Sequence, residues 1–434
     1  MTEKILNVLK EQQIGEYLLL DVQKETVELF FIKKNLDMRR AENVRTCSVT
    51  VYRDFEKDGQ LCKGESAFVA EPSATEEEIS EKCRRAYLAA GFVANPHYEL
   101  YAGTKEETVT VESSLARVSA EEAAGAMAKA LFAADVQEKS FLNSAELFVE
   151  KKNVHICNSR GVDVSYVKYR VSGEVVAQCK EPQDVETFEN FSYDDLNTDA
   201  LTDLVRQTLE MTEDRAAAQA APVTGTYDVV LSDEYAATIF DFYRARGGGD
   251  SIYQHYSDYK VGDFVQGKPE EVTGELLCLD YVPTVPFSDD GVPMKALPCI
   301  SKGVFQNIQA NVRYAHYLNV PATGWYRKLS CAPGTAAFEE MKRQPGLYVV
   351  NFSDFQMDEW SGHFGGEIRL AYLNDGKTVT PVTGGSINGS IFDAQKCFAF
   401  SKEMQDISKF RGPKAVLLKN VSVAGRTAKQ GSGI

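Results

Sequence analysis

Side chains that could carry out chemistry are few in this 434-residue chain, and they lie far apart. The nearest local group joins His363 to Glu367, with Asp358 and Glu359 just upstream. On a helix, a His and a Glu at this spacing share one face and can bind a metal ion. The glycines within residues 362–366 instead predict a loop or a bulged strand. We therefore favour a structural or solvated role for this group over a metal site. The other four histidines stand alone, at positions 97, 155, 255 and 316.

The cysteines point to ordinary thiols. There are nine, widely scattered, and no two have the CxxC spacing of a zinc knuckle or a thioredoxin-like motif. An odd, dispersed set of this kind is typical of buried thiols in a reducing cytoplasm. Cys331 lies in the turn-like string Ser330–Gly334, where it could be exposed. It has no recognisable His partner, so we favour an inert thiol there as well.

Common phosphate and nucleophile motifs are absent from the sequence. No GxxxxGK[ST] loop, GxGxxG turn or GxSxG elbow occurs. The triple glycine Gly247–Gly249 follows an expected helix rather than opening one, so it cannot direct helix N–H groups at a phosphate. We interpret it as a flexible hinge or a helix stop.

Composition excludes several classes of protein. The chain has 47 Lys+Arg against 63 Asp+Glu, a net charge of -16, and 44% hydrophobic residues. Disorder does not fit that apolar content, and duplex nucleic-acid binding does not fit the acidic balance. No segment approaches the roughly 18–20 apolar residues of a membrane helix. The first residues, Met1–Gln13, contain no apolar signal core, so we expect a cytoplasmic protein without membrane or direct nucleic-acid contact.

The elements that must position these residues follow from periodicity and capping. In the first half we expect strands at 27–32, 48–52 and 66–70, with a turn at Asp58-Gly59. Capping boxes start two helices, one at Thr75 with Glu78 and one at Ser119 with Glu122. Further strands are expected at 145–151, 153–157 and 162–178, with turns at Gly161 and at Ser172-Gly173, before a helix at 198–215.

A linker at 216–224 places the main boundary near residue 220. After it we expect the strand Tyr227–Leu231, a helix capped by Ser232, and a long region of short strands. The predicted class is α+β, with a mixed α/β N-terminal part built from an antiparallel sheet and helices, and a β-rich C-terminal part. The expected divisions are 1–110, 111–220 and 221–434.

Several short strings occur in a characteristic order along the chain. Together they resemble the TldD/PmbA family, named for candidate modulators of DNA gyrase, and the likeness covers nearly the whole chain. The strings are Asn158–Gly161, Pro286–Pro293, Gly346–Val350, Ser361–Phe364, Leu373–Lys377, Pro381-Val382 and Val423–Gly425. The resemblance implies a β-rich C-terminal domain of the TldD/PmbA type.

The family's catalytic member, TldD, resembles a zinc peptidase with a HExxxH helix and a C-terminal cysteine ligand. In this chain the motif would fall on residues 241–246, where Asp241 replaces the first His, Phe242 the general base and Arg246 the second His. An arginine cannot offer a lone pair to zinc, and no cysteine lies near Phe410–Pro413. The resemblance therefore implies that this chain binds no zinc, has no catalytic residues of its own, and lies closer to the PmbA/TldE side. We expect Asp241 and Arg244 to form an exposed helical ion pair.

The leading hypothesis is a non-catalytic subunit of a cytoplasmic metallopeptidase. The resemblance implies a TldD-type partner that carries the zinc, or a homodimer, and the processing of small or unfolded peptides. A peptide could be held as an added strand at a sheet edge of the C-terminal part. Tyr253, Tyr256 and His363 are the predicted lining of such a peptide site, although core packing remains the alternative for any one tyrosine.

Two other functions stay open. One is a protein-binding modulator of DNA gyrase, because the acidic charge allows contact with protein while arguing against DNA itself. The other is a hydrolase with a relocated site at His363 and Glu367 or at Cys331.

Overall fold

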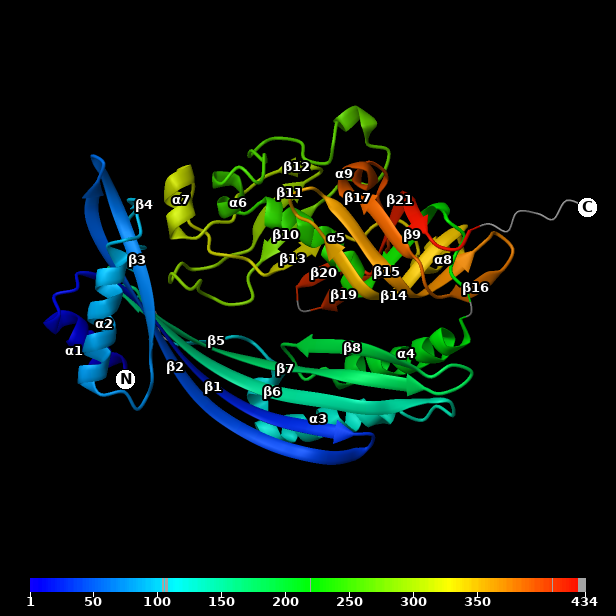
Figure 1. Ribbon diagram of the computed structural model, residues 1–434, viewed down its shortest axis with the longest axis horizontal. Coiled ribbons are helices and arrows are strands. Elements are labelled where there is room, and N and C mark those ends of the chain that lie inside the picture. The colour runs from blue at the N-terminus through cyan, green and yellow to red at the C-terminus, as the bar shows by residue number, and fades with distance from the viewer. Residues whose placement is uncertain (104, 106–107, 219, 408, 428–434) are drawn as a thin grey trace, which may run out of the picture.

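The computed structural model describes residues 1–103, 105, 108–218, 220–407 and 409–427. The expected α+β class with antiparallel sheets is confirmed. Figure 1 shows a long curved sheet formed by the N-terminal half, with the C-terminal half lying against one side of it. None of the described helices is long and apolar enough to cross a membrane.

The N-terminal sheet has eight strands in the order β4-β3-β2-β1-β6-β7-β5, with β8 also pairing with β7. Their bounds are β1 Glu16–Ile32, β2 Asn35–Lys57, β3 Gln60–Ala70, β4 Asn95–Pro96, β5 Val109–Thr110, β6 Ser140–Asn158, β7 Asp163–Cys179 and β8 Val185–Tyr193. Strands from both sides of the predicted boundary at residue 110 thus share one sheet. The division there remains a prediction.

One expected turn in this sheet is wrong. Gly173 lies inside β7, paired with Leu147 on β6 and with Phe191 on β8. A Cβ at Gly173 would lie only 2.0 Å from the Glu146 carbonyl oxygen, so the glycine permits close strand packing rather than a turn. The expected strands at 145–151 and 153–157 likewise form one continuous strand, β6. The hairpin turn at Asp58-Gly59 is confirmed, with positive φ at both residues.

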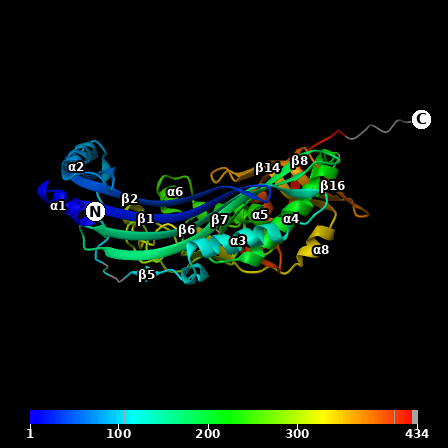
Figure 2. The ribbon, with the colours of Figure 1, turned by 90° about the horizontal axis from the view of Figure 1, so that it is seen from below.

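Helices cover one face of the sheet at its two ends. Helix α1 (Thr2–Glu11) packs with α2 (Glu76–Ala90) at one end, and α3 (Ala120–Ala133) with α4 (Thr198–Ala217) at the other; Figure 2 shows this arrangement from below. Both predicted capping boxes are confirmed, at Thr75 and at Ser119. Sequence reasoning missed α1, whose buried face is Ile5, Val8 and Leu9.

The C-terminal half is built around helix α5 (Asp233–Arg246). Strands β14, β9, β21, β17 and β15 form a closed ring, with β16 joined to β15 and β18 to β21. A second sheet has the order β12-β11-β10-β13-β20-β19. The ring and its added strands are β9 Gly225–Ser232, β14 Gly346–Met357, β15 His363–Asn374, β16 Val379–Val382, β17 Ser386–Ser390, β18 Ala399–Phe400 and β21 Ala415–Ala424.

Short elements complete this half. The second sheet consists of β10 Leu279–Val282, β11 Leu297–Ser301, β12 Val304–Phe305, β13 Lys328–Cys331, β19 Met404–Ile407 and β20 Phe410–Pro413. The remaining helices are α6 Gly249–Tyr253, α7 Val312–Leu318, α8 Phe338–Arg343 and α9 Ile391–Ala394. Helix α5 is buried on several sides, and its Ile239, Phe240 and Tyr243 are fully enclosed in the core. This helix is therefore a rigid support for whatever lies at its end.

Two of the family-like strings meet where the halves join. The Asn158 side-chain oxygen accepts hydrogen bonds from Arg160 N at 2.8 Å and Val162 N at 3.1 Å, which closes the Asn158–Gly161 turn. A Cβ at Gly291, whose φ is +81°, would lie 2.3 Å from a methyl group of Val162. The turn and the Pro286–Pro293 string thus pack directly on each other. A polar cavity of about 130 Å³ lies beside them, between the two halves.

The stability of the protein is expected to depend on pH through Glu189, at a second contact between the halves. Burial, followed by the nearby carboxylates of Asp233 and Glu234, raises the pKa of Glu189 on β8 to about 8. A raised folded-state pKa means that the native state binds the extra proton, so this stabilisation is lost as pH rises toward 8. We expect Glu189→Gln to stabilise the protein by about 1–3 kcal/mol at pH 9 and by almost nothing at pH 4.

Thermal unfolding of both proteins across that range measures the effect. Glu186→Gln on the same strand is the matched control, because Glu186 is exposed. An equal gain for Glu189→Gln at pH 4 and pH 9 would contradict the assignment.

Candidate functional site

An open groove of about 860 Å³ crosses the C-terminal half where the end of β14, the start of β15 and β17 lie together. Glycines 365 and 366 on β15 contribute no side chains, which leaves the groove open over that strand. The lining residues are Asp354, Gln356, Met357, Asp358, Glu359, Trp360, His363, Phe364, Gly365, Gly366, Glu367, Ser386, Ile387 and Asn388.

Strand β15 offers no free edge in this groove. The segment His363–Glu367 of β15 pairs with β17 on one side, and Phe364–Gly366 pairs with β14 on the other. A peptide lying over β15 would therefore contact side chains instead of extending that strand. Strand β14 pairs with β9 only at Leu347–Val349, so within the described residues the outer side of its segment 354–357 has no partner, and the expected added strand at a sheet edge stays a prediction there.

The structure brings two of the three predicted lining residues to the groove. His363 lines it directly. Tyr256 is about half exposed, and its ring centroid lies 4.5 Å from that of the lining residue Trp360. Tyr253 instead packs against Tyr317 of α7, with ring centroids 4.9 Å apart. A role in binding peptide stays a prediction for all three residues.

The groove is acidic and aromatic. Four carboxylates and the Trp360 ring line it, and no Lys or Arg is among its lining residues. Backbone N–H groups of Ser361 and Trp360 donate to Asp358 and lower the pKa of its carboxyl. Burial, followed by the carboxylate of Asp241, raises the pKa of Glu359. The groove is therefore suited to cationic groups with adjoining apolar surface.

His363 and Glu367 do not form a local metal pair. Both lie on strand β15, where four residues span about 13 Å. The Glu367 carboxylate accepts a hydrogen bond from the Ser353 hydroxyl at 3.0 Å. Across the part of the chain that the structure describes, no group of three or more His, Cys, Asp or Glu side chains gathers as a metal site.

Helix α5 holds the residues at the three family zinc-motif positions. Asp241 forms a bidentate ion pair with Arg244, with N···O distances of 2.5 and 2.8 Å. Each side chain is only about a quarter exposed, so the expectation of an exposed pair is wrong. Packing of the loops beside α5 covers the pair, and Arg244 also donates to the Tyr326 carbonyl at 3.3 Å.

The other two motif positions are buried. Phe242 is 1% exposed and meets the rings of Tyr243 and Phe392 at 5.2 and 5.7 Å. The Arg246 guanidinium donates to the Tyr256 carbonyl at 2.9 Å and pairs with Asp258. It also lies 5.1 Å from the centre of the Tyr259 ring.

These three side chains do not fit a zinc ion. A catalytic zinc needs neutral imidazole, thiolate or carboxylate donors with free lone pairs. Phe242 has no donor atom, and a guanidinium has none to give. The one carboxylate, Asp241, is held by Arg244. The chemistry of this donor set therefore does not support a zinc site at these positions.

The end of α5 lies next to the groove. Arg246 holds the loop that carries Tyr256, and Tyr256 contacts Trp360 in the groove wall. Glu359 is close enough to Asp241 and Arg244 for their charges to shift its pKa in opposite directions. Arg246, at a family motif position, and Tyr256, a predicted lining residue, thus meet at one place. Trp360 and Asp354 were missed as lining residues, and the paired glycines that follow them were the available signal.

Two further expectations can be compared with the structure. Cys331 lies on β13 and is buried, so the exposed turn is wrong, and burial raises the pKa of its thiol. Gly247 ends α5, as expected, but Gly248 caps the short helix α6 and Gly249 begins it, so the expectation that the triple glycine opens no helix is wrong. The three glycines are also tightly packed. A Cβ at Gly247 would lie 2.1 Å from the Tyr281 hydroxyl, and one at Gly249 would lie 2.9 Å from the Ala310 Cβ. A flexible hinge therefore does not fit these positions.

Comparisons with known proteins place the chain among characterised folds. Residues 108–221 match the PmbA/TldA metallopeptidase central domain, and residues 224–425 match the PmbA/TldA metallopeptidase C-terminal domain. No curated protein matches the chain.

Solved structures share the whole fold. A protein from Thermotoga maritima described as a candidate modulator of a DNA gyrase has a TM-score of 0.78 at 17% identity, over 98% of this chain and 99% of its own. TldE from Thermococcus kodakarensis gives 0.77 at 15% identity, over 97% and 100%. A candidate gyrase modulator from Bacteroides thetaiotaomicron gives 0.73 at 14% identity, over 98% and 99%.

Proposed function

The chain belongs to the PmbA/TldD metallopeptidase family, and on that premise we propose that it is a non-catalytic, peptide-binding subunit of a cytoplasmic metallopeptidase. In this proposal a TldD-type partner supplies the zinc and the reaction. This chain holds part of a small or unfolded peptide in the groove at the end of α5.

One observation carries the proposal. At the end of α5, where the family's zinc motif would fall, the side chains are a buried phenyl ring, a buried guanidinium and a carboxylate held by arginine. The groove beside them remains open. A chain with an open groove beside positions that cannot bind a metal ion can bind a peptide without hydrolysing it.

The charged and aromatic side chains of the groove indicate which peptides it would bind. Carboxylates from Asp358, Glu359 and Glu367 face it, together with the Trp360 ring. A lysine or arginine side chain of a peptide could pair with these carboxylates while its apolar stem covers the indole. We therefore expect a preference for peptides rich in basic residues.

The decisive experiment is peptidase activity of this chain, of a TldD-type subunit, and of the two mixed. We expect the chain alone to be inactive and to purify without stoichiometric zinc. The mixture should form a complex that is more active than the TldD-type subunit alone. Peptidase activity with stoichiometric zinc in this chain alone would overturn the non-catalytic role.

Gyrase binding is the competing outcome, since two of the similar structures are described as candidate gyrase modulators. A pull-down with gyrase subunits at increasing salt concentration separates the two functions. Salt-resistant capture of gyrase, with no effect of this chain on a TldD-type peptidase, would replace the proposal with the modulator function.

Neutralising the groove gives a sharper test of peptide binding. We expect Glu359→Gln with Glu367→Gln to weaken binding of a fluorescent Lys-rich decapeptide about three- to tenfold, because each lost ion pair is worth up to about 1 kcal/mol. Fluorescence anisotropy measures this directly, and the salt dependence of binding should become shallower.

The matched control is Glu76→Gln with Glu77→Gln, which removes the same charge from the exposed first turn of α2. Equal weakening by both pairs would show a general charge effect, and the groove would then lose its role.

A further inference from the structure

Strand β2 has a long open edge. It pairs with β1 along almost its whole length, but its contact with β3 begins only at Cys47. Within the described chain, no strand pairs with the outer side of the segment 35–46. Figure 1 shows this segment as the outermost strand at the lower rim of the sheet, on the side away from the C-terminal half.

An open edge of this length invites another strand. Its unpaired N–H and C=O groups form a template that natural proteins usually cover or break. Here Leu36, Met38 and Val44 are all exposed, at 52%, 45% and 46%. The bulge near Asp37 interrupts only the end of the segment, and the pairing of β2 with β1 is regular from Met38 to Tyr52. The available edge therefore includes at least Met38–Val44.

Symmetry restricts how a second copy can pair with this edge. When two identical strands pair antiparallel about a two-fold axis, directly opposed residues point to the same face. Side chains alternate between faces along a strand, so the axis must pass midway between the two copies of a residue that opposes itself. Only a few registers are then available, each centred on one residue of the segment.

The register centred on Ala41 matches charge with charge and apolar with apolar side chains. It places Arg40 opposite Glu42 and Met38 opposite Val44. The small Ala41 side chain opposes its own copy on the axis, and each strand contributes both members of each pair.

Neighbouring registers are unfavourable. Centring on Arg40 or on Glu42 places like charges directly opposite each other on the axis. Centring on Glu42 also opposes Arg39 and Arg45. Centring on Arg39 opposes two arginines, and centring on Asn43 brings Glu42 against Val44. Like charges directly opposite destabilise a strand pair, so the Ala41 register is the favoured one.

We propose that a second copy of this chain adds to the β2 edge in antiparallel orientation, with the two-fold axis midway between the two Ala41 residues, so that one sheet continues across two chains. The groove lies in the C-terminal half, and β8, at the other edge of the sheet, is the strand nearest that half (Figure 1). The pairing therefore leaves the groove open, and it does not depend on the proposed peptidase role.

Substitutions that place a positive or a negative charge at position 41 provide the test. Ala41→Arg would oppose two arginines and Ala41→Glu two glutamates. We therefore expect the dimer dissociation constant of each variant alone to be at least tenfold higher than that of the wild type. Mixed in equal amounts, the two variants should re-form a dimer, because arginine then opposes glutamate. Analytical ultracentrifugation measures all three samples. Ala89→Arg on α2 is the matched control, since Ala89 is also exposed.

Each outcome decides the proposal. A monomeric wild type at high concentration overturns it, and so does a dimer that neither variant weakens. Two monomeric variants that fail to recover when mixed overturn the Ala41 register. Ala41→Cys supplies a second measurement, because two cysteines on the axis should cross-link under mild oxidation, whereas Asn43→Cys, which opposes Arg39, should not.

A failure here is distinguishable from a failure of the peptidase role. Ala41→Arg should still bind the Lys-rich decapeptide as tightly as the wild type does, because all groove residues are unchanged.

Discussion

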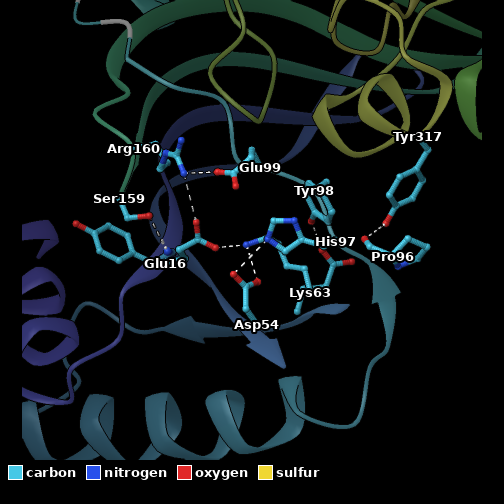
Figure 3. Close-up of polar contacts among 12 residues, drawn as sticks. Glu16, Asp54, Lys63, Pro96, His97, Tyr98, Glu99, Ser159, Arg160 and Tyr317 are labelled. Carbon is cyan, nitrogen blue, oxygen red and sulfur yellow. Dashed lines mark hydrogen bonds and ion pairs between the residues drawn. The ribbon is translucent and has the colours of Figure 1, made fainter. Parts of the chain in front are cut away.

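Replacing Lys63 by methionine is expected to lower the free energy of unfolding of the N-terminal half by about 3 kcal/mol, within the roughly 3–5 kcal/mol typical of a broken buried ion pair. Lys63 is 0% exposed on β3, and Figure 3 shows its amine between two carboxylates. Its Nζ lies 2.8 Å from Asp54 Oδ1 and also pairs with Glu16.

The loss arises from the carboxylates left behind. Methionine keeps most of the apolar stem of Lys63, so little packing is lost. Glu16 and Asp54 are 23% and 43% exposed, and without Lys63 they keep only more distant partners, Arg160 at 3.8 Å from Glu16 and the His97 ring at 3.3 Å from Asp54. Their partial exposure lets water screen part of the repulsion, which places the expected loss at the lower end of the range.

Hydrogen exchange of β3 and thermal unfolding measure this effect. Lys63→Met combined with Glu16→Gln and Asp54→Asn should recover most of the stability, because no unpaired charge remains. Lys57→Met at the exposed end of β2 is the matched control. Wild-type stability of Lys63→Met alone would show that the amine contributes nothing to the fold.

This network shows why the sequence predicted elements better than sites. The capping boxes at Thr75 and Ser119 and the turn at Asp58-Gly59 depend on residues within a few positions of each other, and they were found. Lys63 reads as an ordinary surface lysine. It is buried because β1, β2 and β3 align Glu16, Asp54 and Lys63 across 47 residues of sequence. Local sequence patterns do not show which residues of different strands lie side by side.

The same reasoning applies to the groove. His363 and Tyr256 were predicted as lining of a peptide site that the family resemblance implied, but the contact of Tyr256 with Trp360 depends on the loop that Arg246 holds. The turn predicted at Gly173 is wrong because a contact with another strand, and not the local sequence, requires glycine there. The close approach of the Glu146 carbonyl, which makes glycine necessary there, comes from a neighbouring strand and not from Gly173's own sequence context.

Installing the family's zinc motif in this chain is expected to unfold the C-terminal half rather than create a metal site. The variant carries Asp241→His, Phe242→Glu and Arg246→His. The largest loss comes from Phe242, which is 1% exposed and packs against Tyr243 and Phe392. Removing a buried phenyl ring costs about 3–5 kcal/mol, and burying a carboxyl without a partner adds at least about 1 kcal/mol.

Arg246 adds to the loss. Its guanidinium holds the Tyr256 carbonyl and Asp258 and lies against the Tyr259 ring, and a histidine is too short to reproduce this set of contacts. Phe242→Leu separates packing from charge, because it keeps the site apolar and should cost only about 1–2 kcal/mol.

Circular dichroism on heating and zinc content by mass spectrometry provide the measurements. We expect the triple variant to melt at a clearly lower temperature than Phe242→Leu and to hold no stoichiometric zinc. If the triple variant instead folded normally and bound one zinc per chain, the end of α5 would be a latent metal site. The absence of zinc binding would then be due to the residues at positions 241, 242 and 246 alone, and not to the packing of the core around them. The burial of Phe242 and Arg246 in a common aromatic cluster is the reason to expect the first result.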